Sequence, residues 1–151
     1  MRFLPLLAVL LLAACSSVRE QWAEATLTSI SYPALYGVVL STVDSRGFPV
    51  RERDPHTGEI HSEWVYGQSR AAVRGPARQR VHASIEPQPG DAFLLRLRVE
   101  QEVVRKGGML ATNVRESENW EPYEDNFDEA EILMGKIAAL LAANRSREPT
   151  P

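Results

Sequence analysis

Five side chains of types that commonly bind metal ions lie within ten residues of one another. They are Asp54, His56, Glu59, His61 and Glu63. Carboxylate and imidazole groups are zinc ligands, but a zinc site needs three or four ligands that converge on one point. The turn formers from Asp54 to Gly58 place His56 in a turn, whereas His61 and Glu63 share one face of a strand. We therefore favour a solvent-exposed hairpin over a metal site, and predict neither a metal nor a cofactor.

No motif typical of catalysis accompanies these residues. The chain has no Gly-x-Ser-x-Gly elbow, no Gly-x-x-x-x-Gly-Lys phosphate loop and no Gly-x-Gly-x-x-Gly turn. An acidic patch near the C-terminus lies where a helix is expected to begin, and acids favour that positive end of the helix dipole. Its members are Glu124, Asp125, Asp128, Glu129 and Glu131. We interpret them as a solvated helix start and predict that the protein is not an enzyme.

Four arginines lie within eleven residues that contain no acid. They are Arg70, Arg74, Arg78 and Arg80. Guanidinium groups suit phosphate and carboxylate ligands, so one hypothesis is contact with lipid head groups, lipopolysaccharide or an acidic partner. The alternative, which we favour, is a solvated loop between two strands, because Gly75-Pro76 marks a turn. The formal net charge of the chain is −3, which does not indicate a nucleic-acid partner.

The only cysteine of the chain ends an apolar N-terminal stretch. Arg2 precedes an unbroken apolar run of twelve residues, 3–14, which is shorter than the roughly 20 residues that span a bilayer and is typical of a secretory signal. The segment Leu12-Ala13-Ala14-Cys15 resembles the lipobox of bacterial lipoproteins. This resemblance implies a signal peptide over residues 1–14 and acylation of Cys15. The alternative is an ordinary signal peptide with an incidental cysteine.

A lipidated Cys15 would hold the mature protein at a membrane surface. Two or three acyl chains anchor firmly, since each buried methylene group contributes about 0.8 kcal/mol. Ser16, rather than aspartate, follows the cysteine, and resemblance to the enterobacterial sorting rule then implies the outer membrane. We expect a lipoprotein on the periplasmic face of that membrane, with residues 15–28 forming the lipidated cysteine and its tether.

Hydrophobic periodicity predicts a single domain over residues 29–143, followed by a disordered tail over 144–151. One helix is expected over 33–46, with Pro33 in its first turn and a left-handed Gly47 at its end. A second helix is expected to begin after the cap Asn126 and to end near Ala143. Its apolar stripe consists of Ala130, Leu133, Ile137, Leu140 and Leu141.

Between the helices the alternation of apolar and polar residues predicts two hairpins. The strands of the second hairpin, near 80–86 and 93–103, carry charged residues on one face, which is expected to meet water. Trp64 and Trp120 are either core residues or anchors for a partner or lipid surface. In the first hairpin Trp64 shares a face with Ile60, which favours the core, whereas Trp120 lies in a connection and both interpretations stay open for it. The expected fold is α+β, a two-layer antiparallel sheet of about four strands covered by two helices in the order α-β-β-β-β-α.

Three segments together resemble the pattern of BamC-like lipoproteins of the outer-membrane β-barrel assembly machinery. They are Gly47-Phe48-Pro49-Val50, Gly58-Glu59-Ile60-His61-Ser62-Glu63-Trp64, and Trp120 ahead of a helical C-terminal end. In that family a helix leads into Gly-Phe, and a turn leads into a strand of the form Gly-x-Ile-x-Thr-x-Trp; Ser62 here takes the place of threonine. The resemblance implies a helix-grip domain without catalytic residues.

These observations leave two hypotheses about function. The first is a membrane-anchored, non-enzymatic interaction or envelope-assembly module, for which an envelope protein complex is a candidate partner. The second is a binder of lipid, lipopolysaccharide or another small amphiphile, held between the sheet and the C-terminal helix, with Arg70 to Arg80 meeting its anionic part.

Overall fold

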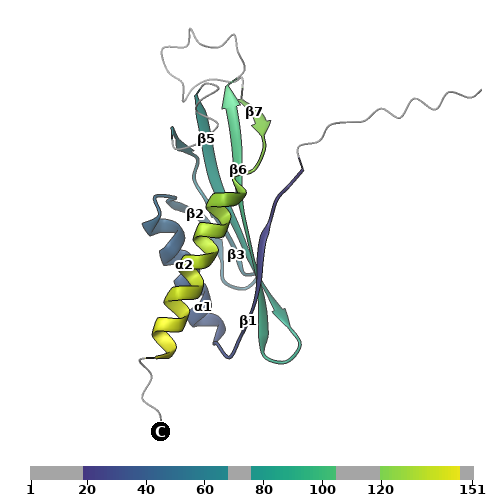
Figure 1. Cartoon of the computed structure of the whole chain (residues 1–151), viewed down its shortest axis with the longest axis vertical. Coiled ribbons are helices and arrows are strands. Elements are labelled where there is room, and N and C mark those ends of the chain that lie inside the picture. The colour runs from purple at the N-terminus through teal and green to yellow at the C-terminus, as the bar shows by residue number, and fades with distance from the viewer. Residues whose placement is uncertain (1–18, 68–75, 105–119, 147–151) are drawn as a thin grey trace, which may run out of the picture.

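A computed structural model describes residues 19–67, 76–104 and 120–146 of the chain (Figure 1). This part consists of one antiparallel sheet and two helices, which confirms the predicted α+β class. The elements in chain order are β1 (Ala23–Thr28), α1 (Tyr32–Ser45), β2 (Val50–Asp54), β3 (Glu59–Ser62), β4 (Val65–Tyr66), β5 (Ala77–Gln88), β6 (Ala92–Val104), β7 (Trp120–Tyr123) and α2 (Phe127–Arg145).

The sheet has seven strands rather than about four. Five of them lie in the order β1-β6-β5-β3-β2, while β4 pairs with β5 and β7 pairs with β6. The long hairpin of β5 and β6 is the centre of the sheet, with register pairs from Ala77↔Val103 to Gln88↔Ala92. The expected second hairpin is therefore confirmed, and each of its strands is longer than predicted.

The prediction of a tether up to residue 28 is wrong, because β1 lies within it. Its six residues pair with β6, from Ala23↔Leu97 to Thr28↔Ala92. Main-chain hydrogen bonds to β6 hold this edge strand, and its Ala23 and Leu27 pack with the buried core. The domain therefore includes residues before Ser29. It also extends past Ala143, because α2 ends at Arg145.

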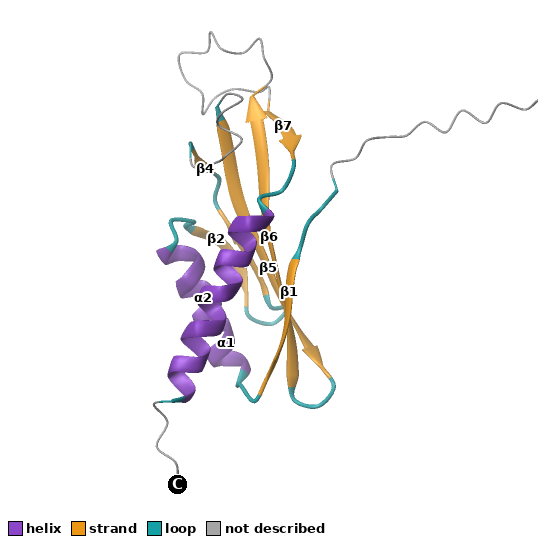
Figure 2. Cartoon of the chain, in the orientation of Figure 1, coloured by secondary structure: helices purple, strands orange, loops and turns teal. Residues whose placement is uncertain are grey.

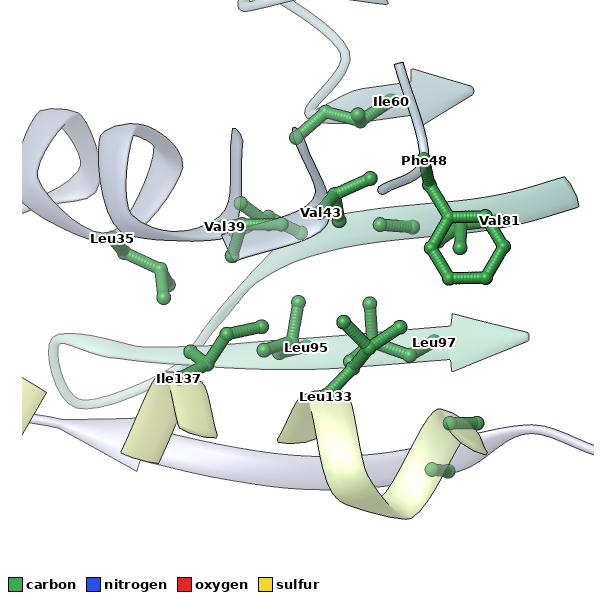
Figure 3. Packing of buried hydrophobic residues seen from close by; sticks show 14 of the residues in the cluster. Leu35, Val39, Val43, Phe48, Ile60, Val81, Leu95, Leu97, Leu133 and Ile137 are labelled. Carbon is green, nitrogen blue, oxygen red and sulfur yellow. The ribbon is translucent and has the colours of Figure 1, made fainter. Parts of the chain in front are cut away.

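Both helices cover the same face of the sheet (Figure 2). Side chains of α1 and α2 share one buried cluster with the inward-facing residues of the sheet. In Figure 3, Leu133 and Ile137 of α2 point toward Leu95 and Leu97 of β6, and all four are fully buried. This packing confirms the predicted arrangement of two helices on one side. Leu140, expected in the stripe of α2, is instead 46% exposed.

Local signals mark the start of both helices and the end of α1. Ser31 Oγ accepts a hydrogen bond from the Ala34 amide at the start of α1 (3.4 Å), and Gly47, with φ of 94°, follows its end. Asn126 Oδ1 accepts from the Glu129 amide at the start of α2 (3.2 Å). Among the described residues, no helix is both long enough and apolar enough to cross a membrane.

Candidate interaction site on the open sheet face

The face of the sheet that the helices leave uncovered, here called the open face, carries cross-strand ion pairs between β5 and β6. Arg78 lies opposite Glu102, and Arg80 lies opposite Glu100. Arg78 Nε donates to Glu102 Oε2 at 2.7 Å, and Arg80 Nε donates to Glu100 Oε2 at 2.6 Å. Opposite charges are thus paired across the two central strands.

All three tryptophans of the chain contact arginine side chains of this open face. Arg78 lies between two indoles, with its guanidinium carbon 4.3 Å from the Trp64 ring centroid and 4.4 Å from that of Trp120. At the other end of the face, Arg96 lies 5.0 Å from the Trp22 ring centroid. An arginine over an indole face is held by cation–π attraction, by about 0.5–1 kcal/mol at exposed sites.

The prediction that Trp64 belongs to the core is wrong. Ile60 and Ser62 of β3 are buried on the helix side, but the strand is interrupted before β4 begins at Val65. Val65 then lies opposite the buried Gln79, so the interruption shifts the alternation by one residue. Trp64 consequently lies on the open face, and the ring of Tyr66 contacts Trp120 at a centroid distance of 5.9 Å.

Next to this cluster, two histidines from different hairpins meet on the open face. His61 of β3 lies opposite His82 of β5, and their Nδ1 atoms are 2.9 Å apart. His82 Nε2 in turn lies 2.8 Å from Glu100 Oε2. The pKa of Glu100 falls to about 2, because the ring of His82 and then the guanidinium of Arg80 bind its charged form, while burial opposes the shift.

The five metal-ligand types that the sequence places close together do not converge. Asp54 Oδ1 accepts a hydrogen bond from the His56 amide within the turn after β2 (2.8 Å), and both residues are exposed. Of the other three, His61 turns toward His82, while Glu59 and Glu63 are exposed. Within the described ranges, no group of three or more His, Cys, Asp or Glu side chains is placed to hold a metal ion.

The expected acidic patch is only partly solvated. The Asp125 side chain is 1% exposed and accepts from Arg98 Nε at 2.7 Å and from the Gln21 amide at 2.8 Å. Burial disfavours the charge of Arg98, yet its bonds to Asp125 hold the pKa of this guanidinium above the ordinary value. Glu129 pairs with Arg46 of the α1 C-terminus through two hydrogen bonds, at 2.5 and 2.9 Å. These two acids join separate elements.

Only two of the four clustered arginines lie among the described residues. Arg78 and Arg80 are ion-paired and stacked on indoles, so neither is a free anion receptor. Arg70 and Arg74 lie outside the described residues, as does the expected lipid attachment site Cys15.

The space between α2 and the sheet is filled by the protein's own side chains. Leu133, Ile137 and Leu141 of α2 are at most 1% exposed, and the β6 residues that face them are equally buried. A ligand held in that layer would have to displace these side chains, which costs about 2–5 kcal/mol for each leucine or isoleucine that leaves the core. The packing therefore does not favour the amphiphile hypothesis.

The contacts of His82 and Glu100 on the open face could not be predicted from the sequence. The alternation shows only that His82 and Glu100 lie on the polar faces of two strands and point away from the core. The register that brings His82 against His61 comes from β3 pairing with β5, twenty-one residues away.

Comparison of the chain with protein-family models and with curated proteins finds no match.

Proposed function

We propose that this chain is a non-enzymatic lipoprotein, acylated at Cys15, that binds an envelope protein through the open face of its sheet. The observation that carries the proposal is the position of the tryptophans. Trp22, Trp64 and Trp120 all stack on arginines outside the buried core. Tryptophan, tyrosine and arginine are the residues most enriched at energetically important positions of protein interfaces.

The charge balance of the open face favours a protein over an anionic lipid or lipopolysaccharide. Among the described residues, each of the four open-face arginines of β5 and β6 has at least one carboxylate within 3 Å, so these four leave no dense positive field. A polyanion needs uncompensated cations, whereas a surface of stacked aromatics within paired charges resembles a protein interface. The four pairs are Arg78–Glu102, Arg80–Glu100, Arg96–Glu24 and Arg98–Asp125.

The short distance between anchor and domain supports a partner close to the membrane. Glu20 forms an ion pair with Arg98 (2.9 Å), and the amide of Gln21 donates a hydrogen bond to Asp125. Five peptide steps separate Cys15 from Glu20, and they reach at most about 18 Å. An acylated Cys15 would therefore keep the open face close to the bilayer, which suits our proposed location on the periplasmic side of the outer membrane.

The helix-grip arrangement of BamC-like lipoproteins remains part of this proposal. The order of the elements, with α2 following the sheet and packing across it, is compatible with that arrangement. A role beside a barrel-assembly complex is one outcome of the experiment below.

Site-specific photo-crosslinking tests the proposal in intact envelopes. A photoreactive amino acid is placed at Ser84 on the open face, opposite the arginine that lies over Trp22, and in a second protein at the exposed Leu140 of α2. We expect one defined envelope protein to crosslink from position 84 and not from position 140. The crosslink should be lost with Trp64→Ala and weakened with Cys15→Ala.

Two results would contradict the proposal. One is a crosslinking result: either positions 84 and 140 crosslink equally, or the crosslink is undiminished in a Trp64→Ala protein whose unfolding temperature equals that of the unmutated protein. The other is stoichiometric lipid extracted from the purified protein and identified by mass spectrometry, which would instead support the amphiphile hypothesis.

A further inference from the structure

The histidine pair on the open face brings one ring nitrogen of each side chain into direct contact. His61 and His82 present Nδ1 to Nδ1 at 2.9 Å, with ring centroids 5.0 Å apart and planes at 71°. The remaining nitrogen of each ring faces a carboxylate. His82 Nε2 lies 2.8 Å from Glu100 Oε2, and His61 Nε2 lies 3.7 Å from Glu59 Oε2.

This pattern matches the way metal-binding histidines are held. A histidine ligand usually donates its other ring N–H to a carboxylate, which fixes the tautomer and points the free lone pair at the ion. Because Glu100 accepts from His82 Nε2, the lone pair of His82 lies on Nδ1, facing His61. Glu59 lies close enough to His61 Nε2 to accept a hydrogen bond from it after a small side-chain movement.

We propose that His61 and His82 form a two-histidine site for a divalent transition ion of the zinc or copper class. Zinc–nitrogen bonds of about 2.0–2.1 Å in a tetrahedron place two nitrogens about 3.3 Å apart. The two Nδ1 atoms therefore need to separate by only a few tenths of an ångström, and each ring must turn so that its lone pair points at the ion instead of at the other ring. The proton between the rings moves from Nδ1 of His61 to its Nε2, toward Glu59, and both Nδ1 lone pairs then bind the ion. No covalent bond of the protein changes.

The surroundings give the ion room and access to water. The two histidines line a pocket of about 230 Å³, together with Glu52 and Glu63. Two arginines also line it, and each is paired with a carboxylate: Arg80 with Glu100 at 2.6 Å, and Arg51 with Glu52 at 3.6 Å. Because no third ligand of the described chain is in place, water fills the remaining positions. Imidazole suits zinc, copper and nickel, whereas magnesium prefers oxygen ligands.

Calorimetric titration with ZnCl₂, and with MgCl₂ as a comparison ion, tests the site. The protein is the full-length chain carrying Cys15→Ala, which removes the only thiol, purified without a histidine tag. We expect one zinc ion per chain and no response to magnesium. His56→Ala is the matched control, because it removes the exposed turn histidine and should bind zinc as the parent does.

The variants of the pair decide the outcome. His61→Ala and His82→Ala should each abolish the stoichiometric binding, and Glu100→Gln should weaken it by about 10- to 100-fold. Imidazole nitrogen NMR of the parent should show zinc-dependent shifts at His61 and His82 only. The proposal is overturned if the parent binds no zinc, or if binding survives unchanged in a folded His61→Ala protein, whose side chain is 35% exposed and tolerant of replacement.

Discussion

Asp125 is a buried carboxylate that joins three parts of the chain. It accepts hydrogen bonds from Arg98 of β6 and from the Gln21 amide before β1, directly ahead of the α2 cap. Breaking a buried ion pair by removing one partner is strongly destabilising, because it leaves the other charge uncompensated. This carboxylate therefore contributes much more to the stability of the fold than the exposed acids around it.

Asp125→Asn should lower the free energy of unfolding by about 3 kcal/mol, near the lower end for such pairs because Arg98 keeps Glu20 as a second partner. Urea unfolding at neutral pH, followed by tryptophan fluorescence, measures the change. Glu24→Gln is the control, since it removes a half-exposed partner of Arg96 and should change stability by less than about 1 kcal/mol. Equal losses in the two variants would refute the structural role of Asp125.

Residues with local roles were predictable from the sequence, and residues with distant partners were not. Asn126 and Gly47 act on the next or preceding helical turn, so a short window contains their signal. Asp125 binds an amide 104 positions away, and it carries the same composition signal as its solvated neighbours. The acidic patch could be located in this way, but its buried member could not be identified.

The turn between β2 and β3 depends on a glycine that touches the next strand. Gly58 has φ of 80°, and a Cβ there would lie 2.3 Å from the carbonyl oxygen of Ile85 in β5. The same two residues are joined by a hydrogen bond from the Ile85 amide to the Gly58 carbonyl (3.1 Å). The close approach therefore fixes how the β2–β3 hairpin joins the centre of the sheet.

Gly58→Ala should destabilise the fold by more than the 1–2 kcal/mol or so of a left-handed alanine, because the new methyl group also pushes β3 from β5. Gly37→Ala in α1 meets nothing within 4 Å and should stabilise the fold by up to about 1 kcal/mol. Thermal unfolding of both proteins measures the two effects. The packing described here would be wrong if the Gly58→Ala protein melted with the parent.

At the scale of elements, strong internal periodicity was readable and edge strands were not. β5 and β6 alternate over a dozen residues, so their faces follow from the sequence alone. β1 does alternate between apolar and polar residues, but two of its three apolar residues are alanines, so its signal is weak. β7 has no buried residue and shows no alternation. The prediction for Trp64 failed because the alternation shifts by one residue between β3 and β4, and the sequence pattern does not show where such a shift occurs.

At the scale of the whole molecule, the residues before Ser29 close one side of the sheet. β1 covers β6 through six register pairs, contacts α2, and continues the Glu20 and Gln21 contacts with Arg98 and Asp125. Without it, the main chain of β6 between Ala92 and Leu97 would lose its outer partner. A segment expected to be a passive tether is thus part of the folded unit.

Two truncated chains test whether β1 belongs to the folded domain or is a tether outside it. A chain beginning at Arg19 retains β1 and its ion pairs, and we expect it to unfold cooperatively at the temperature of the full-length protein. A chain beginning at Ser29 should melt at a lower temperature and show faster hydrogen exchange at the amides of residues 92–97, whose partner strand is gone. Equal melting and exchange would mean that the domain begins at Ser29, that β1 adds nothing to its stability, and that the tether is long enough to let the open face leave the membrane surface.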